Sequence, residues 1–286
     1  SDSHNGQLLG DTDGTKYIRL TGSQTGKSHV MTQSIDSPTG QLIFKNRLRF
    51  NNAGAVVTLT GGYPFWSSSR YTCPVSLNFN GSAITLNGTT LKNGDNNAQF
   101  TTGAWYDVVL SADKSTETCY AQVFSTDGQL LAESGILAWS ETSSPSYFSI
   151  GMGNSSTGSV DMATYEAYQP LPANFQLVVD KATLSIPNKE QAQLTATVTD
   201  DNGYAVIGKA TWTVVEEDMQ QSITITPDAT DSHKAVVTLA ESAEAGTATI
   251  QVSIGGMTKS IELSLTSSAE SIKFTQSTTS ITIPLD

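Results

Sequence analysis

Apolar and polar residues alternate along most of the chain, in short runs separated by turn residues. In the first 170 residues the alternation is clearest over 41–50, 55–59 and 75–79. Because successive side chains of a β-strand point to opposite faces, this period of two predicts half-buried strands. The Asn- and Gly-rich clusters at 51–54 and 92–97 contain residues that tolerate positive φ in hairpin turns. We therefore expect meandering antiparallel sheets.

The same alternation continues in the second half of the chain, but the composition of the core changes. Of the 22 aromatic residues, 18 lie before position 171. The change coincides with the stretch 169–174, whose two prolines cannot donate hydrogen bonds to a sheet. We predict a domain boundary at residue 170, with a first core built on aromatic side chains and a second built on Val, Ile and Leu.

An internal repeat divides the second half further. Residues 177–187 are echoed by residues 274–284, and the prolines that end the two segments are 284 − 187 = 97 positions apart. This period is the size of an immunoglobulin-like sandwich. The predicted domains are therefore 1–170, 171–268 and 269–286, the last being the start of a second repeat. We expect the chain to belong to a longer protein with further domains.

Three segments of the second half carry a family resemblance. Leu184–Pro187, the pair Thr211-Trp212 and the run Gly246–Ile250 resemble the cysteine-free bacterial immunoglobulin-like modules known as Big domains. The resemblance covers about 90 residues and implies a β-sandwich that serves as a spacer in adhesins and in polysaccharide-degrading enzymes. In such a sandwich Trp212 is expected to fill the space between the sheets.

The first half resembles a different family. A strand that opens at Trp105, the hairpin at Asp127-Gly128 and the runs 147–153 and 158–168 are similar to the laminin-G-like and concanavalin-A-type lectin sandwich. The predicted fold class is all-β: a concanavalin-A-like jelly-roll sandwich plus an immunoglobulin-like β-sandwich. Because one fold carries many functions, this resemblance gives function only by analogy.

Composition limits the kinds of partner. The chain has 15 Lys and Arg against 27 Asp and Glu, so its formal charge of −12 repels phosphate backbones and excludes nucleic acid as an expected partner. No run of about 18 apolar residues occurs, so we expect no membrane insertion. Charged residues make up only 15% of the chain, and this neutral, hydroxyl-rich surface favours an extracellular or cell-surface location.

The two cysteines leave an alternative open. Cys73 and Cys119 both lie in strand-like runs of the first half. In an oxidising compartment they can form a disulfide, and otherwise they are two buried free thiols. Their distance in space decides between these states, and the sequence does not give it.

The sequence contains no clear catalytic constellation. Glycoside hydrolases of the lectin-like fold place two carboxylates on one face of a strand, about 5 Å apart. Asp161 and Glu166 are five positions apart and are expected to point to opposite faces of a regular strand. The three histidines, His4, His29 and His233, are too scattered for a triad or a zinc site. We therefore predict no catalytic residues, although the parent protein can still be a glycoside hydrolase or polysaccharide lyase.

Calcium is the one metal that the lectin-like resemblance brings into question. Asp11-Thr12-Asp13-Gly14 offers two carboxylates and a turn but lacks the remaining acidic ligands of an EF-hand loop. Asp95, among the asparagines of 93–97, is a second oxygen-rich cluster of low specificity. A solvated turn is the alternative interpretation in both places. We therefore predict no cofactor, and calcium is the one possibility that has to be tested.

The strongest candidate site is an aromatic loop between two predicted strands. Three aromatics lie within four positions of one another, followed by an arginine and a fourth ring: Tyr63, Phe65, Trp66, Arg70 and Tyr71. Flat rings stack against the C–H faces of sugars, and Arg and Ser groups bind their hydroxyls or a uronate carboxylate. Trp139 and Tyr147 can extend the same surface or belong to the core.

Two functions remain in competition. The first is a non-catalytic carbohydrate-binding module with an immunoglobulin-like spacer, from a secreted bacterial polysaccharide-degrading enzyme. The second is a surface adhesin or cell-envelope protein with a lectin-like tip on an immunoglobulin-like stalk. A polysaccharide or glycan is the expected ligand in the first case, and a host glycan or protein in the second.

Overall fold

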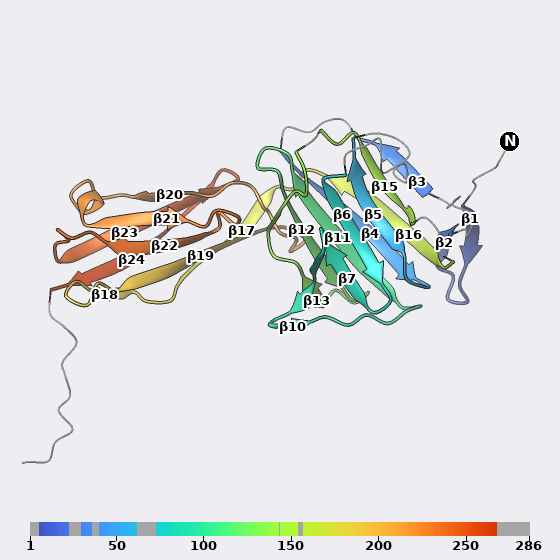
Figure 1. Ribbon diagram of the computed structural model, residues 1–286, viewed down its shortest axis with the longest axis horizontal. Coiled ribbons are helices and arrows are strands. Elements are labelled where there is room, and N and C mark those ends of the chain that lie inside the picture. Colours follow the sequence, from blue (N-terminus) through green and yellow to red (C-terminus); the bar gives the residue numbers. More distant parts are fainter. Residues whose placement is uncertain are drawn as a thin grey trace, which may run out of the picture.

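The fold is built almost entirely of β-strands. A computed structural model of the chain describes residues 6–22, 30–35, 40–61, 73–142, 144–153 and 157–267. It contains 24 strands and, among these residues, one short 3-10 turn at Met219–Gln221. Figure 1 shows two β-sandwiches placed end to end along the long axis. The predicted all-β fold class is confirmed, with one sandwich for each of the two that were expected.

The first sandwich contains a large antiparallel sheet of ten strands. In spatial order they are β1 (Gln7–Gly10), β2 (Lys16–Thr21), β16 (Ser159–Tyr168), β4 (Gln41–Phe50), β11 (Trp105–Asp113), β12 (Thr118–Phe124), β13 (Leu130–Glu133), β9 (Lys92–Asn93) and β10 (Asn96–Asn97), with β14 (Leu137–Ala138) beside β12. The first and last segments of this half of the chain thus lie side by side, because β2 pairs with β16.

A six-stranded antiparallel sheet packs against the ten-stranded sheet and completes the first sandwich. Its order is β3 (Val30–Ser34), β15 (Tyr147–Met152), β5 (Ala55–Thr60), β6 (Val75–Asn80), β7 (Ala83–Leu86) and β8 (Thr89–Thr90). Aromatic stacks join the two sheets: Phe44 and Phe148 have ring centroids 4.8 Å apart, and Phe50 and Phe79 are 4.5 Å apart. Each fully buried Phe contributes about 1.5–3 kcal/mol, and the buried Leu, Val and Ile side chains around these rings contribute in the same way.

Strand β4 follows the predicted alternation from Phe44 to Phe50, whereas Ile43 on its outer face is buried as well. Phe44 and Leu48 point into the core and are fully buried, whereas Lys45, Arg47 and Arg49 point away from it. Around Arg47 and Arg49 the outer face of the ten-stranded sheet is therefore charged, while the inner face is mostly apolar.

One expectation about this sheet is wrong. Strand β16 contains an irregularity between Met162 and Thr164, where an extra residue is inserted opposite β4. Asp161 lies opposite Arg49 and Glu166 lies opposite Lys45, so both carboxylates point outward on the same face. A bulge reverses the side-chain phase beyond it, which a count of residues along a regular strand does not anticipate.

The second sandwich consists of two four-stranded sheets. One has the order β17 (Pro172–Val179), β19 (Gln191–Asp200), β22 (Lys234–Leu239) and β21 (Ile223–Pro227), and the other has β18 (Thr183–Ser185), β24 (Met257–Thr266), β23 (Gly246–Ile254) and β20 (Thr211–Val214). Trp212 is half-buried between the aliphatic clusters, and its indole N–H donates to the carbonyl of Ser232 at 2.8 Å. The predicted boundary at residue 170 falls between β16 and β17, and the predicted start of the second repeat lies outside the described residues.

Specific hydrogen bonds join the two sandwiches. The loop after β19 lies against the outer face of the ten-stranded sheet, where the Gln41 amide donates to Ala205 O at 2.8 Å and accepts from Ile207 N at 2.8 Å. Gln122 accepts from Ala205 N at 2.9 Å. Two glutamine side chains thus replace the missing backbone partners of the loop, which fixes its position on the sheet.

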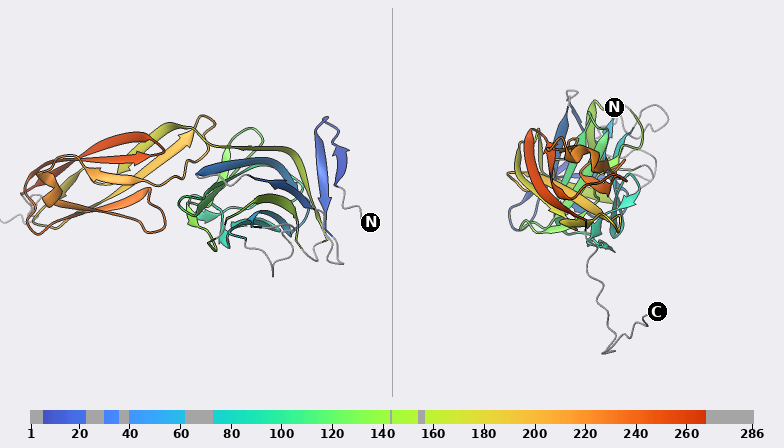
Figure 2. Two further views of the ribbon diagram at one scale, coloured as in Figure 1. Left: turned by 90° about the horizontal axis from the view of Figure 1, so that it is seen from above. Right: turned by 90° about the vertical axis from the view of Figure 1, so that its left-hand side faces the viewer.

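A small apolar cluster completes this joint. Tyr204, 9% exposed, packs with the buried side chains of Ile43 and Val109 and meets Phe124 edge to face at 5.5 Å. The ammonium group of Lys45 lies 5.6 Å from the centre of the Tyr204 ring. Buried apolar area and directed hydrogen bonds together hold the sandwiches in one orientation. The left view of Figure 2 shows the two sandwiches end to end.

We expect Tyr204→Ala to weaken this joint. Removing a large buried ring costs about 3 kcal/mol, so the two sandwiches of the full chain should unfold in separate calorimetric transitions. Val215→Ala, which shortens a half-exposed side chain of the second sandwich, is the control and should leave the melting profile unchanged. A Tyr204→Ala profile identical to that of the wild type would contradict the account of the joint.

Candidate functional site

The predicted aromatic loop connects two strands of the six-stranded sheet. Its residues Tyr63, Phe65, Trp66, Arg70 and Tyr71 lie outside the described residues. The described chain reaches the loop from β5, which ends at Thr60, and leaves it at Cys73, before β6. The surroundings of these two ends therefore define where the loop is attached.

Tyr147 lies at the start of the loop. As the first residue of β15 it is paired with Thr60, the last residue of β5, and the two side chains share the outer face of the sheet. Ser146 N donates to Thr60 O at 2.9 Å and continues the pairing. Tyr147 is half-buried.

The other end of the loop is held by the segment 139–141. Ser140 N donates to Pro74 O at 3.0 Å, and the Ser140 hydroxyl donates to Cys73 O at 3.0 Å. The carboxylate of Glu141 accepts from Cys73 N. Both residues that the sequence placed near the loop, Trp139 and Tyr147, thus come from segments that contact its two ends.

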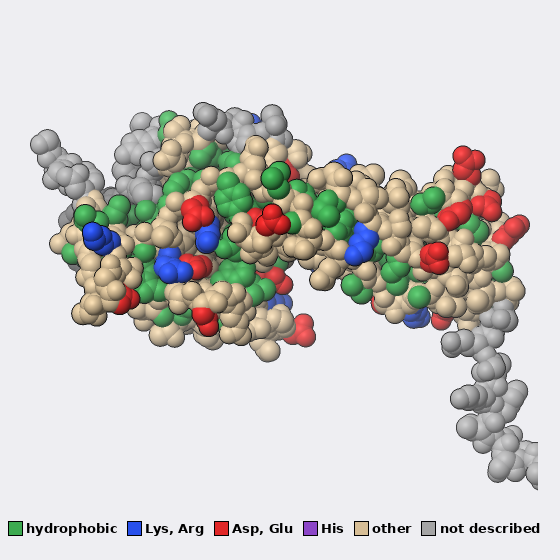
Figure 3. Space-filling model, turned by 180° about the vertical axis from the view of Figure 1, so that it is seen from behind, with side chains coloured by type: hydrophobic (Ala, Val, Ile, Leu, Met, Phe, Trp, Pro, Cys, Tyr) green, Lys and Arg blue, Asp and Glu red, His purple; other side chains and the backbone are tan. Residues whose placement is uncertain are grey.

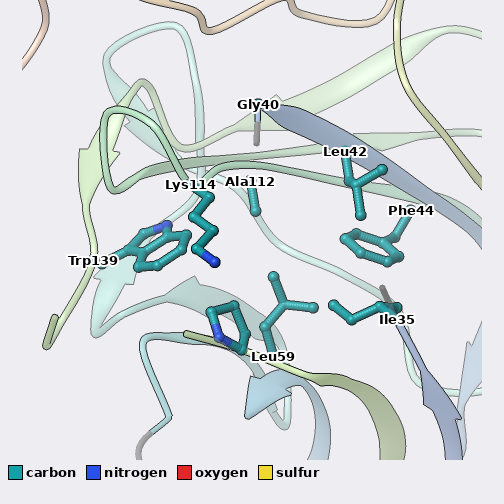
Figure 4. A pocket seen from close by; sticks show the side chains of 9 residues that line it. Ile35, Gly40, Leu42, Phe44, Leu59, Ala112, Lys114 and Trp139 are labelled. Atoms are coloured by element: carbon teal, nitrogen blue, oxygen red, sulfur yellow. The ribbon is translucent and has the colours of Figure 1, made fainter. Parts of the chain in front are cut away.

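Trp139 itself belongs to the core. It is 8% exposed, and its indole N–H donates to Thr118 O at 2.9 Å. Figure 4 shows the ring at one end of a crevice between the sheets, with Leu42 on one side, Leu59 on the other and Lys114 beside the ring. The crevice has a volume of about 10 Å³, room for at most one water molecule. Of the two interpretations of Trp139, the structure supports packing over a sugar platform.

The outer face of the six-stranded sheet forms the candidate site, which we call the neutral face. Its residues alternate with core side chains along each strand. They are Ser34, Val56, Thr58, Thr60, Ser76, Asn78, Asn80, Ala83, Thr85, Thr90, Tyr147, Ser149 and Gly151. None of these described positions is ionisable at neutral pH. Hydroxyl and amide groups both donate and accept hydrogen bonds, as the hydroxyls of a sugar do.

The neutral face has an open and a closed part. Ser76, Asn78 and Thr85 are partly exposed, whereas Thr58 and Ser149 are 2% and 1% exposed. Within the described residues, the Thr58 hydroxyl is buried without a hydrogen-bond partner. A buried hydroxyl without a partner is costly, so a ligand or a water molecule that reached Thr58 would gain a ready donor and acceptor.

A turn asparagine fixes the open part in place. Asn87 adopts φ 46°, and its side chain accepts from Ser76 N at 2.8 Å and donates to Pro74 O at 3.0 Å. Asn78 in turn donates to the Ser76 hydroxyl at 3.0 Å. Asn tolerates a left-handed conformation better than most residues. This single residue therefore joins the β7–β8 turn to the end of the aromatic loop.

The opposite sheet carries two aspartates and two arginines packed with two aromatic rings, which we call the charged cluster: Asp11, Tyr17, Arg19, Arg49, Trp105 and Asp161. The Arg49 guanidinium lies 4.7 Å from the centre of the Tyr17 ring and 4.4 Å from that of Trp105. Figure 3 shows Lys and Arg side chains beside Asp and Glu side chains on the first sandwich, whereas acidic side chains gather at the far end of the second.

Asp161 is the centre of the charged cluster. Its fully buried carboxylate accepts from Arg19 at 2.7 Å, from Arg49 at 2.8 Å and from Asn51 at 2.9 Å. Burial alone would raise the pKa of Asp161, but the hydrogen bonds from Arg19, Asn51 and Arg49 outweigh it and lower the pKa. The carboxylate is thus ionised and fully engaged.

These contacts argue against an acid–base pair on this sheet. Asp161 and Glu166 pair with Arg49 and Lys45 of β4, which are four residues apart, or about 13 Å along the strand. Asp161 is committed to two arginines and cannot act as a proton donor. The geometry is that of a structural ion-pair network.

The carboxylates of the two oxygen-rich clusters lie in different surroundings. Both carboxylate oxygens of Asp11 accept hydrogen bonds from Arg49, at 2.7 and 3.1 Å, and one also accepts from the indole of Trp105. A carboxylate neutralised by a guanidinium is a poor ligand for a hard cation. Asp95 lies in the exposed turn between β9 and β10. In the described ranges no group of three or more His, Cys, Asp or Glu side chains is placed to bind a metal.

The cysteines are not paired. Cys73 and Cys119 are both free thiols, Cys119 being fully buried. Burial raises the pKa of Cys119 to about 12, and burial together with the charge of Glu141 raises that of Cys73 to about 11. The structure thus supports free thiols over a disulfide, but only Cys119 is buried as expected and Cys73 is half-buried.

Several solved structures align with a part of this chain at low similarity. Peanut lectin with a 9-mer peptide aligns with a TM-score of 0.38 and 11% identity, over 57% of this chain and 88% of the lectin. The catalytic domain of a glycoside hydrolase family 131 protein from Coprinopsis cinerea gives 0.40 and 13%, over 58% of this chain and 78% of that domain. A legume lectin-like domain from Entamoeba histolytica gives 0.33 and 15%, over 58% and 88%.

At such low identity and TM-score, these likenesses give no argument about what the chain binds. No known protein-family model matches the sequence, and no curated protein matches it either. The described part of the chain contains no helix with the length and apolarity of a membrane span.

The sequence analysis identified neither the neutral face nor the charged cluster as a group of neighbouring residues. The neutral face was visible in the sequence, since every second residue of 76–80 and of 58–60 is Ser, Thr or Asn. The charged cluster was not, because it joins Asp11, Arg49 and Asp161 across more than 100 positions of the chain. Only the strand order brings these residues together.

We expect the charged cluster to make the free energy of unfolding fall at acidic pH. Because the folded-state pKa of Asp161 lies below its ordinary value, its stabilising contribution is complete above about pH 4 and is lost as the pH falls through the folded pKa. Asp161→Asn should cost about 3 kcal/mol at neutral pH by leaving Arg19 and Arg49 without their buried partner. Urea unfolding between about pH 7 and pH 2 measures both effects.

Asp107→Asn is the matched control. Its partner Arg47 has a side chain that is 36% exposed, so this more solvated pair should contribute less than about 1 kcal/mol. Equal losses for the two variants, or an Asp161→Asn protein with the acid sensitivity of the wild type, would contradict the role given to Asp161.

We expect both thiols to be unreactive in the folded protein. Raised pKa values and burial keep the thiolate fraction small at about pH 8, so Ellman's reagent should react slowly with the native chain and rapidly with two thiols in urea. An absence of thiols in urea without reductant would indicate a disulfide and would contradict the free-thiol state.

Proposed function

We propose that the first sandwich is a non-catalytic carbohydrate-binding module. The observation that carries this proposal is the neutral face, a row of hydroxyl and amide groups that ends where the aromatic loop is attached. Sugars are bound by two kinds of contact, C–H stacking on rings and hydrogen bonds to hydroxyls. The loop supplies the rings Tyr63, Phe65, Trp66 and Tyr71, and Ser76 and Asn78 supply the hydrogen bonds.

The rest of the chain takes a supporting role in this proposal. The second sandwich acts as the spacer of a secreted, multimodular bacterial enzyme that degrades a polysaccharide, with the catalytic domain elsewhere in that protein. Binding rather than catalysis is favoured because Asp161, the best placed acid on the opposite sheet, is held by Arg19 and Arg49. The module would keep the enzyme on its insoluble substrate outside the cell.

A surface adhesin is the second candidate. The observation in its favour is the joint between the sandwiches, where Gln41 and Gln122 fix the loop around Ala205. A fixed joint suits a stalk that must hold a binding tip away from a cell surface. The coding sequence on either side of this segment separates the candidates: a hydrolase or lyase domain supports the enzyme, whereas a cell-wall anchor with many more repeats supports the adhesin.

We expect Trp66→Ala to weaken glycan binding about tenfold, since the loss of one stacked ring corresponds to about 1.4 kcal/mol. Tyr147→Ala should have a smaller effect in the same direction, because only part of this ring is exposed. Affinity electrophoresis and calorimetry on a panel of plant and microbial polysaccharides measure the change, with Val215→Ala as the control. Unchanged binding by Trp66→Ala, or no binding by the wild type, would contradict the proposal.

A further inference from the structure

A groove lies between the two sandwiches, beside the joint. Its volume is about 230 Å³, and both sandwiches supply its walls. One wall is the outer face of β12 and β13, which carries Tyr120 and Glu133. The other wall is formed by β19, the start of β22 and the residues just before it, and its polar side chains are Thr195, Thr197, Asp231 and Lys234. Ligand sites occur preferentially at interfaces between domains.

Hydrogen bonds hold both walls of this groove in place. Gln122 accepts from Ala205 N at 2.9 Å and fixes the loop around Ala205, which lines the groove. On the second sandwich, His233 is 5% exposed, and its Nε2–H donates to Gly208 O at 2.7 Å. The carbonyl of His233 accepts from Ala196 N at 2.8 Å. Because the walls are already ordered, a ligand that binds here pays little for ordering them.

The wall on the first sandwich carries a carboxylate with acceptor capacity to spare. The Tyr120 hydroxyl donates to the Glu133 carboxylate. Burial, this hydrogen bond and the charges of Glu133 and Asp231 raise the pKa of Tyr120, so the phenol remains a donor. A carboxylate can accept about four hydrogen bonds. Among the described residues Glu133 has no cationic partner and no side-chain donor other than Tyr120, so most of this capacity is unused.

The wall on the second sandwich adds donors and further acceptors. Thr195 and Thr197 are exposed on one face of β19, and no hydrogen bond within the described part of the chain uses their hydroxyls. Thr195 lies opposite Lys234, whose ammonium group is 3.1 Å from the carboxylate of Asp231. An ammonium group has three donors, so this one contact leaves part of its capacity free.

We propose that the groove between the sandwiches is a second glycan site, which binds a short stretch of a sugar chain through both sandwiches. Each sugar hydroxyl both donates and accepts, and the groove offers carboxylate acceptors beside hydroxyl and ammonium donors. Its volume lies just below the range of about 300–1,000 Å³ for small-molecule sites, so only a short stretch fits. This site goes beyond the proposed function, in which the second sandwich is only a spacer, and it is built from described residues.

Binding in the groove depends on the joint, because the two walls belong to different sandwiches. Tyr204 is buried in the joint and does not line the groove. Tyr204→Ala, which loosens the joint, lowers the fraction of molecules in which the walls face each other. It should therefore weaken binding in the groove at least about threefold and leave binding to the neutral face unchanged.

Nuclear magnetic resonance of the labelled full chain observes the groove and the neutral face separately. The probes are short oligosaccharides of cellulose, xylan, mannan and polygalacturonate. With at least one of them, we expect saturable shifts in the amide signals of both walls of the groove, including those of Glu133, Thr195 and Thr197.

A matched pair of variants locates the effect in the groove. Thr197→Val removes one hydroxyl at almost constant volume and should weaken binding in the groove about threefold, the loss of one hydrogen bond. Thr213→Val makes the same change at an exposed threonine of β20, in the other sheet of the second sandwich, and should not alter binding.

Groove signals that no probe moves, or equal affinities of Thr197→Val and Thr213→Val in the groove, would overturn this inference. Shifts on the neutral face alone would overturn it while leaving the proposed function standing. Shifts in the groove alone would support it and count against the neutral face as the glycan site. If the signals of neither surface respond, the proposed function and this inference both fail.

Discussion

Each side chain of a β-strand can serve only one face of its sheet, and strand β4 shows how much of the molecule depends on this constraint. Its inward residues, Phe44 and Leu48, build the aromatic core. Its outward residues divide into Arg47 and Arg49, which belong to the charged face, and Gln41 and Ile43, which meet the second sandwich. A shift of register by one residue would exchange these sets and remove core, ion pairs and joint together.

The joint between the sandwiches makes the second sandwich a spacer of fixed orientation. A spacer connected only by a linker leaves the domains free to rotate, as is usual where the contact between them is small and polar. Here the Gln41 amide satisfies both a carbonyl and an N–H of the loop, and Tyr204 is buried against the sheet. A binding face on the first sandwich is therefore presented at a set angle to the second sandwich.

The sequence predicted what depends on local pattern. The strands, the aromatic core and the position of Trp212 between sheets follow from alternation and from residue size. It could not predict what depends on insertions or on distant pairing. The bulge beside Met162 placed Asp161 and Glu166 on one face, and the pairing of β2 with β16 brought Arg19 to Asp161. In the candidate site, the role of Tyr147 stays a prediction, whereas Trp139 is buried in the core.

The central claim is that the neutral face of the first sandwich is the glycan-binding surface. Nuclear magnetic resonance of the labelled chain, titrated with an oligosaccharide of a polymer that binds, tests it most directly. The account predicts shifts in the amide signals of β5, β6, β7 and β15, including those of Ser76, Asn78 and Tyr147, with the signals of Arg19 and Arg49 unmoved. Shifts confined to the charged cluster, or to the loop around Tyr204, would contradict it.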